Sequence, residues 1–223
     1  YRLMPAKISF TGRKSQIGEY LKGDYNFISY DLMNEDTWTP LLDSDYIFLL
    51  LPKNKHTLSA VKQFVLKAMD SNIKHIIKIG SLGPWRLVHN QIDSFMLESG
   101  IPYTSFDIAP LMNNIFTEQY ISDDKKLLDY RKNAPAPYLD PVCLSSAIEQ
   151  CIGRKEHYNK NYKCTGDMQY TITEIKDILI AKGYPVNHIE HTTNNRIHKL
   201  MDGDPDTMMM NHIGNRYNTC VLY

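Results

Sequence analysis

The stretch Ile-Lys-His-Ile-Ile-Lys-Ile-Gly-Ser-Leu-Gly at residues 73–83, followed by Ser-Gly-Ile-Pro-Tyr-Thr-Ser at residues 99–105, decides the fold class. The first part predicts a buried strand over residues 76–79 that ends in a Gly-Ser-Leu-Gly turn. A segment of helical length follows, and the Ser-Gly-Ile-Pro turn leads into a second strand over residues 103–109. Strand, helix and strand in this order and at this spacing indicate a parallel βαβ unit.

The ends of these two strands are candidate ligand positions. Open parallel sheets bind their ligands beyond the carboxyl ends of the strands. Gly80 and Ser81 end the first strand, and Ala109 and Pro110 end the second. We therefore predict that these four residues line a crevice.

The same alternation of strands and helices extends over the first half of the chain. Further strands are predicted over residues 7–12, 25–30 and 45–51, and helices over residues 57–71 and 88–98. The run at 45–51 is almost continuously apolar, which is typical of a strand that is covered on both faces. The pattern predicts an α/β fold with a doubly wound, mainly parallel, Rossmann-type sheet.

The regular alternation of strands and helices ends after Leu111, and one or two polar helices are predicted over residues 113–130. Helices over 142–151 and 171–182 and short strands over 162–166 and 186–191 follow. The tail from residue 192 is predicted as a small lid-like lobe or as poorly ordered chain. We divide the protein into a Rossmann-type NAD(P)-binding core at 1–112 and a remainder at 113–223, which carries a small C-terminal, substrate-side lobe.

Composition excludes several classes of function. The 25 Lys and Arg balance the 25 Asp and Glu, so no basic field for nucleic acid or for a membrane surface exists. No apolar run reaches the roughly 20 residues of a membrane span, and no signal peptide is visible. The 4 Cys and the His residues lack metal-ligand spacing, which predicts free thiols, no metal site and a cytoplasmic protein.

Several short motifs, in order, resemble the NmrA-like branch of the atypical short-chain dehydrogenase/reductase family. Festuclavine-type reductases and quinone-reductase-like members are the most similar. The resemblance spans residues 7–191 and rests on Asp31-Leu32 with Glu35-Asp-Thr-Trp38, on Leu49-Leu-Leu-Pro52, on the two segments quoted first, on His89 with Asp93, and on residues 162–178.

The resemblance implies an NAD(P)H-dependent oxidoreductase that acts on a small apolar or conjugated substrate such as an imine, an enone or a quinone. Leu51 and Pro52 would then abut the nicotinamide ribose. Because regulators of this branch bind dinucleotide without turnover, the alternative is a non-catalytic sensor that binds a regulatory protein partner.

The N-terminus departs from the family pattern, and two interpretations compete. In the first, which we favour, residues 7–12 are the family's second strand, and its first strand and glycine loop are absent. Gly12, Arg13, Lys14 and Ser15 then form the following turn, and Arg13 would hold the 2′-phosphate of NADP, which favours NADP over NAD.

In the second interpretation, residues 11–18 are a degenerate dinucleotide fingerprint. Gly12 and Gly18 keep their spacing, whereas Ser15 replaces the middle glycine. Asp31 would then lie about 20 residues on, where an acid that binds the ribose is expected.

The candidate catalytic residues also depart from the superfamily. No Tyr has a Lys four positions later, so the usual proton-donating Tyr-x-x-x-Lys pair is missing. His89 and Asp93 lie one turn apart on the predicted helix, where His89 would be a general acid that Asp93 orients. The alternative is a partly exposed pair that only stabilises the helix. Asp107 stands where relatives carry an arginine, which reverses the sign of a charge near the crevice.

Overall fold

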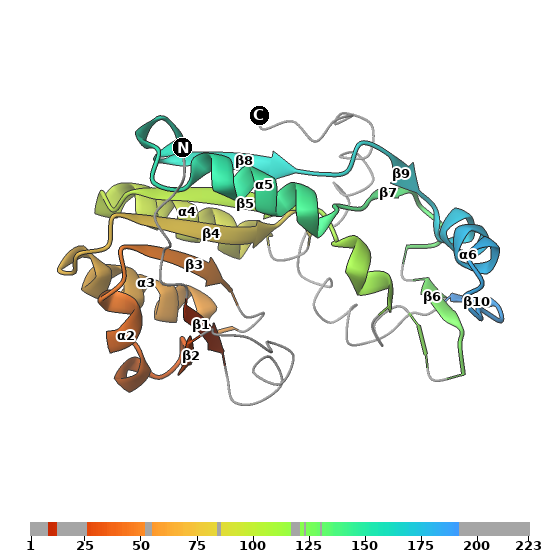
Figure 1. Ribbon diagram of the computed structural model, residues 1–223, viewed down its shortest axis with the longest axis horizontal. Helices are drawn as coiled ribbons and strands as arrows, with labels where there is room; N and C mark the ends of the chain where they lie inside the picture. The colour runs from red at the N-terminus through yellow and green to blue at the C-terminus, as the bar shows by residue number, and fades with distance from the viewer. Residues whose placement is uncertain are drawn as a thin grey trace.

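The computed structural model describes residues 9–12, 26–51, 55–83, 86–116, 121–122, 124–129 and 131–191. Its centre is a four-stranded parallel sheet in the order β3 (Tyr46–Leu50), β4 (His75–Ser81), β5 (Tyr103–Ile108) and β8 (Lys160–Cys164). Figure 1 shows this sheet at one end of the molecule and a smaller lobe at the other. The predicted α/β class with a mainly parallel, Rossmann-type sheet is confirmed.

The βαβ unit predicted from residues 73–109 is present. Strand β4 pairs with β5 in parallel, and α4 (Arg86–Ser99) connects them. Six consecutive residues of β4 are buried, because helices cover both faces of the strand. The register places Gly80 opposite Asp107 and Ser81 opposite Ile108, so the two strands end at the same level.

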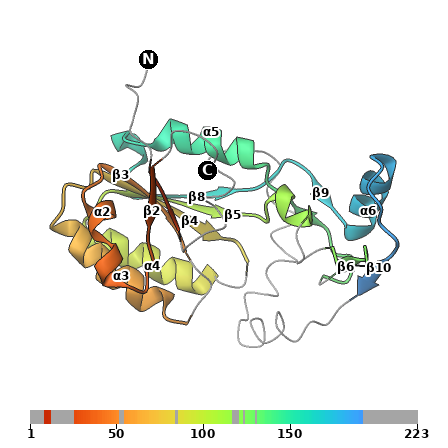
Figure 2. The same cartoon turned by 60° about the horizontal axis from the view of Figure 1, so that its bottom comes forward.

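Helices cover the sheet on both sides, as Figure 2 shows. On one side α3 (Thr57–Met69) and α4 pack on the sheet through a cluster that includes Val61, Phe64 and Met96. On the other side α5 (Pro141–Cys151) covers Ile77 and Phe106. This two-sided cover is what a doubly wound sheet requires.

The prediction that residues 45–51 form a strand covered on both faces is wrong for one face. In β3, Ile47 and Leu49 are buried, whereas Tyr46, Phe48 and Leu50 are exposed. Strand β3 lies at the edge of the four-stranded sheet, and α5 packs over β4 and β5 rather than over β3. A continuous apolar run therefore did not distinguish an edge strand from a central one.

The N-terminal strands β1 (Ser9–Gly12) and β2 (Asn26–Ser29) form a separate parallel pair. In the usual doubly wound order, 3-2-1-4, the second and third strands pair with each other, and the first strand separates them from the fourth. The pairing of β1 with β2 fits both interpretations of the N-terminus, because the second strand of that order pairs with the first strand as well as with the third. The interpretation in which residues 7–12 are the second strand stays a prediction.

The C-terminal lobe is built from two small sheets and one helix. Strand β6 (Leu127–Asp129) pairs in parallel with β10 (Ile189–His191), and β7 (Ala136–Pro137) pairs with β9 (Gln169–Tyr170). Helix α6 (Ile172–Ala181), predicted over residues 171–182, begins at a capping box between Thr171 and Glu174.

For this half of the chain, one prediction is wrong and another concerns residues outside the described ranges. The helices predicted over 113–130 are wrong in the described part, which holds a short 3₁₀ helix, η2 (Met112–Phe116), and the strand β6. Asn113 and Asn114 favour such turns because their side chains compete for backbone hydrogen bonds. The tail predicted from residue 192 lies outside the described residues.

The remaining short elements are the 3₁₀ helices η1 (Glu35–Thr37) and η3 (Lys155–His157) and the helix α2 (Thr39–Leu42). No helix in the described part of the chain is long and apolar enough to cross a membrane.

A buried histidine connects the amino-terminal ends of the sheet. His75 Nδ1 accepts a hydrogen bond from the backbone N–H of Gly153 at 3.1 Å, so Nε2 carries the proton and lies 2.9 Å from Thr104 Oγ1. The Thr104 hydroxyl donates in turn to the backbone oxygen of His157 at 2.6 Å. Burial, followed by the nearby His157, lowers the pKa of His75 to about 4.

We expect this histidine to make the protein less stable in mild acid. The unfolded chain takes up a proton at the ordinary histidine pKa of 6.5, whereas the folded protein resists it down to about pH 4. Stability is therefore complete above pH 6.5 and falls as the pH drops toward 4. Urea unfolding of wild type and of His75→Gln between pH 7 and pH 4 checks this, and an equal loss in both proteins would contradict it.

Candidate functional site

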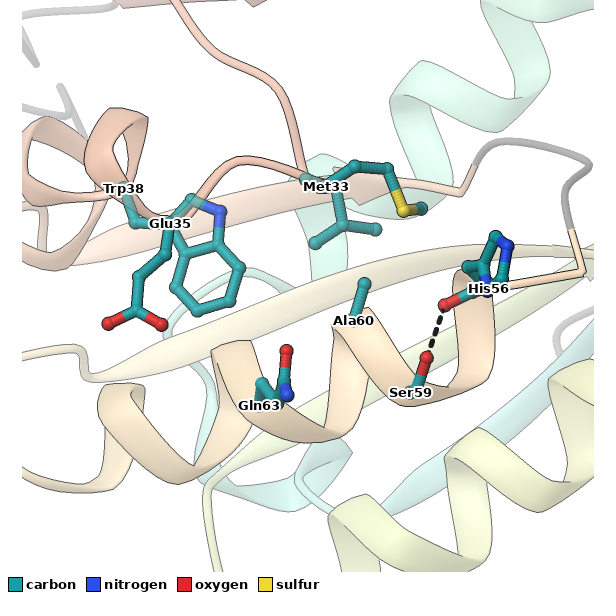
Figure 3. A pocket seen from close by; sticks show the side chains of 8 residues that line it. Met33, Glu35, Trp38, His56, Ser59, Ala60 and Gln63 are labelled. Atoms are coloured by element: carbon teal, nitrogen blue, oxygen red, sulfur yellow. Dashed lines mark hydrogen bonds between the residues drawn. The ribbon is translucent and has the colours of Figure 1, made fainter.

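A pocket lies at the carboxyl ends of β2 and β3 (Figure 3). Its volume is about 330 Å³. The loop after β2 and the first two turns of α3 form its walls. The lining residues are Leu32, Met33, Glu35, Trp38, His56, Ser59, Ala60 and Gln63.

The pocket has an apolar floor and a polar rim. Leu32, Trp38 and Ala60 are buried, whereas the rim residues His56 and Ser59 are exposed. Since ligand pockets range from about 300 to 1,000 Å³, this one accommodates a single ring system rather than a whole dinucleotide. An apolar floor with hydrogen-bonding groups at the edge suits a flat heteroaromatic base.

Asp31 shapes this pocket but does not line it. Its carboxylate accepts a hydrogen bond from the N–H of Met33 at 2.9 Å. Its backbone oxygen accepts from the Trp38 indole at 3.2 Å and from the Thr37 hydroxyl at 3.0 Å. These bonds hold the loop after β2 in the turn that presents Leu32 and Met33 to the pocket.

The residues predicted to line a crevice meet at the ends of β4 and β5. Ser81 Oγ accepts a hydrogen bond from the N–H of Gly83 at 3.0 Å and closes the turn after β4. The N–H of Ala109 donates to the backbone oxygen of Cys164 at 2.9 Å, and the backbone oxygen of Pro110 accepts from Leu139 at 2.9 Å. Leu51 follows β3 directly and is half-buried.

The predicted cofactor residues thus fall into four groups, the first of which is Asp31 and Leu51 in the segments that follow β2 and β3. Gly80, Ser81, Ala109 and Pro110 lie together at the carboxyl edge of the central strands. Gly12 ends β1, in the separate N-terminal pair. Arg13, Lys14, Ser15 and Pro52 lie outside the described residues.

His89 and Asp93 both lie on the buried face of α4. Asp93 Oδ1 is 2.7 Å from the Nζ of Lys78, whose side chain is completely buried, and Asp93 Oδ2 accepts from the Asn161 amide at 2.9 Å. Lys78 also donates to the backbone oxygen of His89 at 3.3 Å. Asp93 therefore forms an ion pair with the buried ammonium group of Lys78 in β4.

Sequence reasoning missed Lys78 and the pocket residues of α3. A lysine inside an otherwise apolar strand was a visible signal, because a fully buried lysine requires an acidic partner. His56, Ser59 and Gln63 stand in the first turns of the helix that follows β3. The rule that ligands bind beyond the carboxyl ends of parallel strands points to that position.

Among the described residues no group of three or more His, Cys, Asp or Glu side chains could hold a metal ion.

Comparison with solved structures identifies similar folds at low sequence identity. An NADPH-dependent quinone oxidoreductase from Escherichia coli, solved with NADPH, superposes with a TM-score of 0.67 at 15% identity, over 96% of this chain and 81% of that chain. A nucleoside-diphosphate-sugar epimerase from Staphylococcus aureus gives 0.64 at 16% identity, over 93% and 79%. A triphenylmethane reductase from Citrobacter sp., solved with NADP(H), gives 0.62 at 16% identity, over 86% and 73%.

Sequence comparison adds no family assignment. No protein-family model matches the chain, and a search of curated proteins finds no relative. The chain has a Rossmann-type fold similar to that of these two reductases and this epimerase.

Proposed function

We propose that this protein is an NAD(P)H-dependent oxidoreductase that acts on a small apolar or conjugated substrate such as an imine, an enone or a quinone. The observation that carries the proposal is the carboxyl edge of the parallel strands. This edge has a pocket for one ring system after β2 and β3, and β4 ends there in two small residues, Gly80 and Ser81.

The residues present fit a dinucleotide whose base occupies the pocket. Leu32, Trp38 and Ala60 would contact the ring faces, and His56 or Ser59 would hydrogen-bond the ring edge. The small side chains at Ser81 and Ala109 would leave room for the nicotinamide and a flat substrate. NADP is proposed over NAD because of Arg13.

The bound dinucleotide would supply the hydride. The protein itself would orient the substrate at the ends of β4 and β5 and exclude water from it. Iminium ions and quinones accept hydride readily, so such substrates suit a chain that lacks the Tyr-x-x-x-Lys pair.

A second candidate is a dinucleotide sensor that acts on a protein partner without turnover. Two observations favour it: the missing Tyr-x-x-x-Lys pair, and the burial of both His89 and Asp93. The two functions differ in one measurable property, because a sensor binds NADPH without consuming it in the presence of any quinone or enone.

The test is a titration with NADPH and with NADH, followed by nicotinamide fluorescence and thermal shift. Filling the pocket with Ser59→Trp is expected to weaken NADPH binding roughly tenfold or more, equivalent to about 1.4 kcal/mol. Leu66→Trp is the matched control, since it adds the same side chain at an exposed position of α3 outside the pocket.

A further variant tests the cofactor preference. Arg13→Ala is expected to weaken NADPH binding and to leave NADH binding unchanged, because only NADPH carries the 2′-phosphate. Absence of binding by either nucleotide up to millimolar concentration would refute the proposed function. Equal effects of Ser59→Trp and Leu66→Trp would refute the role of the pocket.

A further inference from the structure

A buried cluster of charged side chains lies between the sheet and α4, under the carboxyl ends of the strands. Lys78 of β4 is fully buried and forms the ion pair with Asp93 described above. Asp107 of β5 is on the same face, is 2% exposed, and stands opposite Gly80 in the register. Two carboxylates thus share one site with one buried ammonium group.

Asp107 is directed at Gly80, one residue below the point where β4 and β5 end. A methyl group placed on Gly80 would clash with Asp107 Oδ1 and would lie 3.4 Å from Lys78 Nζ. The missing side chain of Gly80 is therefore what makes room for this carboxyl group. Among the described residues, Asp107 Oδ1 receives no hydrogen bond.

The electrostatics of the cluster favour one retained proton. Two carboxylates in one buried site resist simultaneous ionisation, and Lys78 is already engaged by Asp93. Burial raises the pKa of Asp107, and Asp93 adds to this, while Lys78, the Asn161 amide and Arg86 lower it. Burial likewise raises the pKa of Asp93 in spite of Lys78.

We propose that Asp107 carries the proton that the reduction consumes, in place of the missing tyrosine. This inference rests on the proposed function. The substrate carbon gains the hydride from the reduced nicotinamide, the substrate oxygen or nitrogen gains the proton of the Asp107 carboxyl, and Asp107 is left as a carboxylate. The nicotinamide is oxidised, the substrate is reduced, and solvent returns the proton to Asp107.

The groups that face Asp107 explain why this proton can be released. Lys78 comes from β4, Asn161 and Lys163 from β8, and Arg86 and Asp93 from α4. The nearby cations stabilise the carboxylate once the proton has left, and burial stabilises the neutral acid before it leaves. Burial thus favours the neutral carboxyl group of Asp107, whereas the nearby cations favour its carboxylate. A group under both influences can hold a proton and then release it, as a general acid must.

The first test needs no bound cofactor. Infrared spectra of the protein at neutral pH are expected to show the C=O stretching band of a protonated carboxylic acid, and Asp107→Asn is expected to remove it. Asp177→Asn, at an exposed position of α6, is the matched control and should leave the band in place. Absence of the band from wild type, or its persistence in Asp107→Asn, would overturn the inference.

The second test uses NADPH and 1,4-benzoquinone as the probe substrate. Asp107→Asn is expected to lower kcat about 100-fold, within the range for general acids, while the Kd for NADPH stays within about twofold. In wild type kcat should fall as the pH rises and Asp107 ionises, and the variant should lose this dependence. Unchanged turnover in a variant that binds NADPH would overturn the inference alone, whereas failure of wild type to bind NADPH would overturn the proposed function.

Discussion

Replacement of Lys78 by methionine is expected to lower the free energy of unfolding by about 3–5 kcal/mol, the range for loss of one partner of a buried ion pair. Lys78 is completely buried, and its Nζ lies 2.7 Å from Asp93 Oδ1. Methionine has a similar volume, so packing is kept. The loss comes from leaving the Asp93 and Asp107 carboxyl groups in the interior without their shared cation.

Lys74→Met is the matched control for this prediction. Lys74 precedes β4 and pairs with Asp45 at 2.8 Å, but the two side chains are 61% and 57% exposed. Water solvates both charges when the pair is broken, so stability should hardly change. Urea unfolding of the two variants checks the contrast, and equal effects would contradict a buried charge cluster.

The effect of Lys78→Met should also depend on pH. Burial raises the pKa of Asp93 and Asp107 above the ordinary 3.8, so the folded protein retains protons that the unfolded chain releases. Stability therefore falls as the pH rises above 3.8 toward the folded pKa, and without Lys78 this fall should become steeper. The double variant Lys78→Met/Asp93→Leu is expected to recover much of the loss, because it removes a buried charge together with its partner.

Gly166→Ala is expected to cost about 3 kcal/mol of unfolding free energy, the upper part of the range for overpacking. A methyl group at Gly166 would clash with the backbone oxygen of Tyr138 and lie 3.2 Å from its carbonyl carbon. Backbone atoms cannot rotate out of the way as a side chain can. The segment from Tyr138 to Leu139 would have to shift, although backbone hydrogen bonds hold Leu139 to Pro110 and Met112.

Gly183→Ala separates steric overlap from backbone conformation. Gly183 has a φ of +81° and nothing within 4 Å of an added methyl group, so only the left-handed conformation is penalised, at about 1–2 kcal/mol. Chemical denaturation should rank Gly166→Ala as the more destabilised variant. The reverse order would show that the chain at Tyr138 yields easily.

Local sequence patterns were sufficient for the elements of the central sheet. The apolar run at 73–83, its Gly-Ser-Leu-Gly turn and the Ser-Gly-Ile-Pro turn led directly to β4, α4 and β5, because strand, helix and turn preferences all agree over these residues. The helix predicted over residues 171–182 is likewise present as α6. The ligand positions predicted after β4 and β5 rest on strand direction and stay a prediction.

These local patterns did not predict the burial and the contacts that distant parts of the chain produce. Tyr46, Phe48 and Leu50 were expected to be buried, yet they are exposed because α5 (Pro141–Cys151), which lies much later in the chain, packs over β4 and β5 instead. His89 and Asp93 were correctly placed on one helix face. On this face of α4, Asp93 contacts Lys78 of β4 and Asn161 of β8. The sequence of the helix alone does not specify these contacts.

By itself the sequence determined the fold class and the parallel direction of the central strands, since these follow from local periodicity and turn chemistry. Only the tertiary structure decided that Lys78, Asp93 and Asp107 form one buried charge cluster and that the first turns of α3 complete a pocket with the loop after β2. These features join residues far apart in the chain. Their charge and burial depend on the whole fold rather than on any one segment.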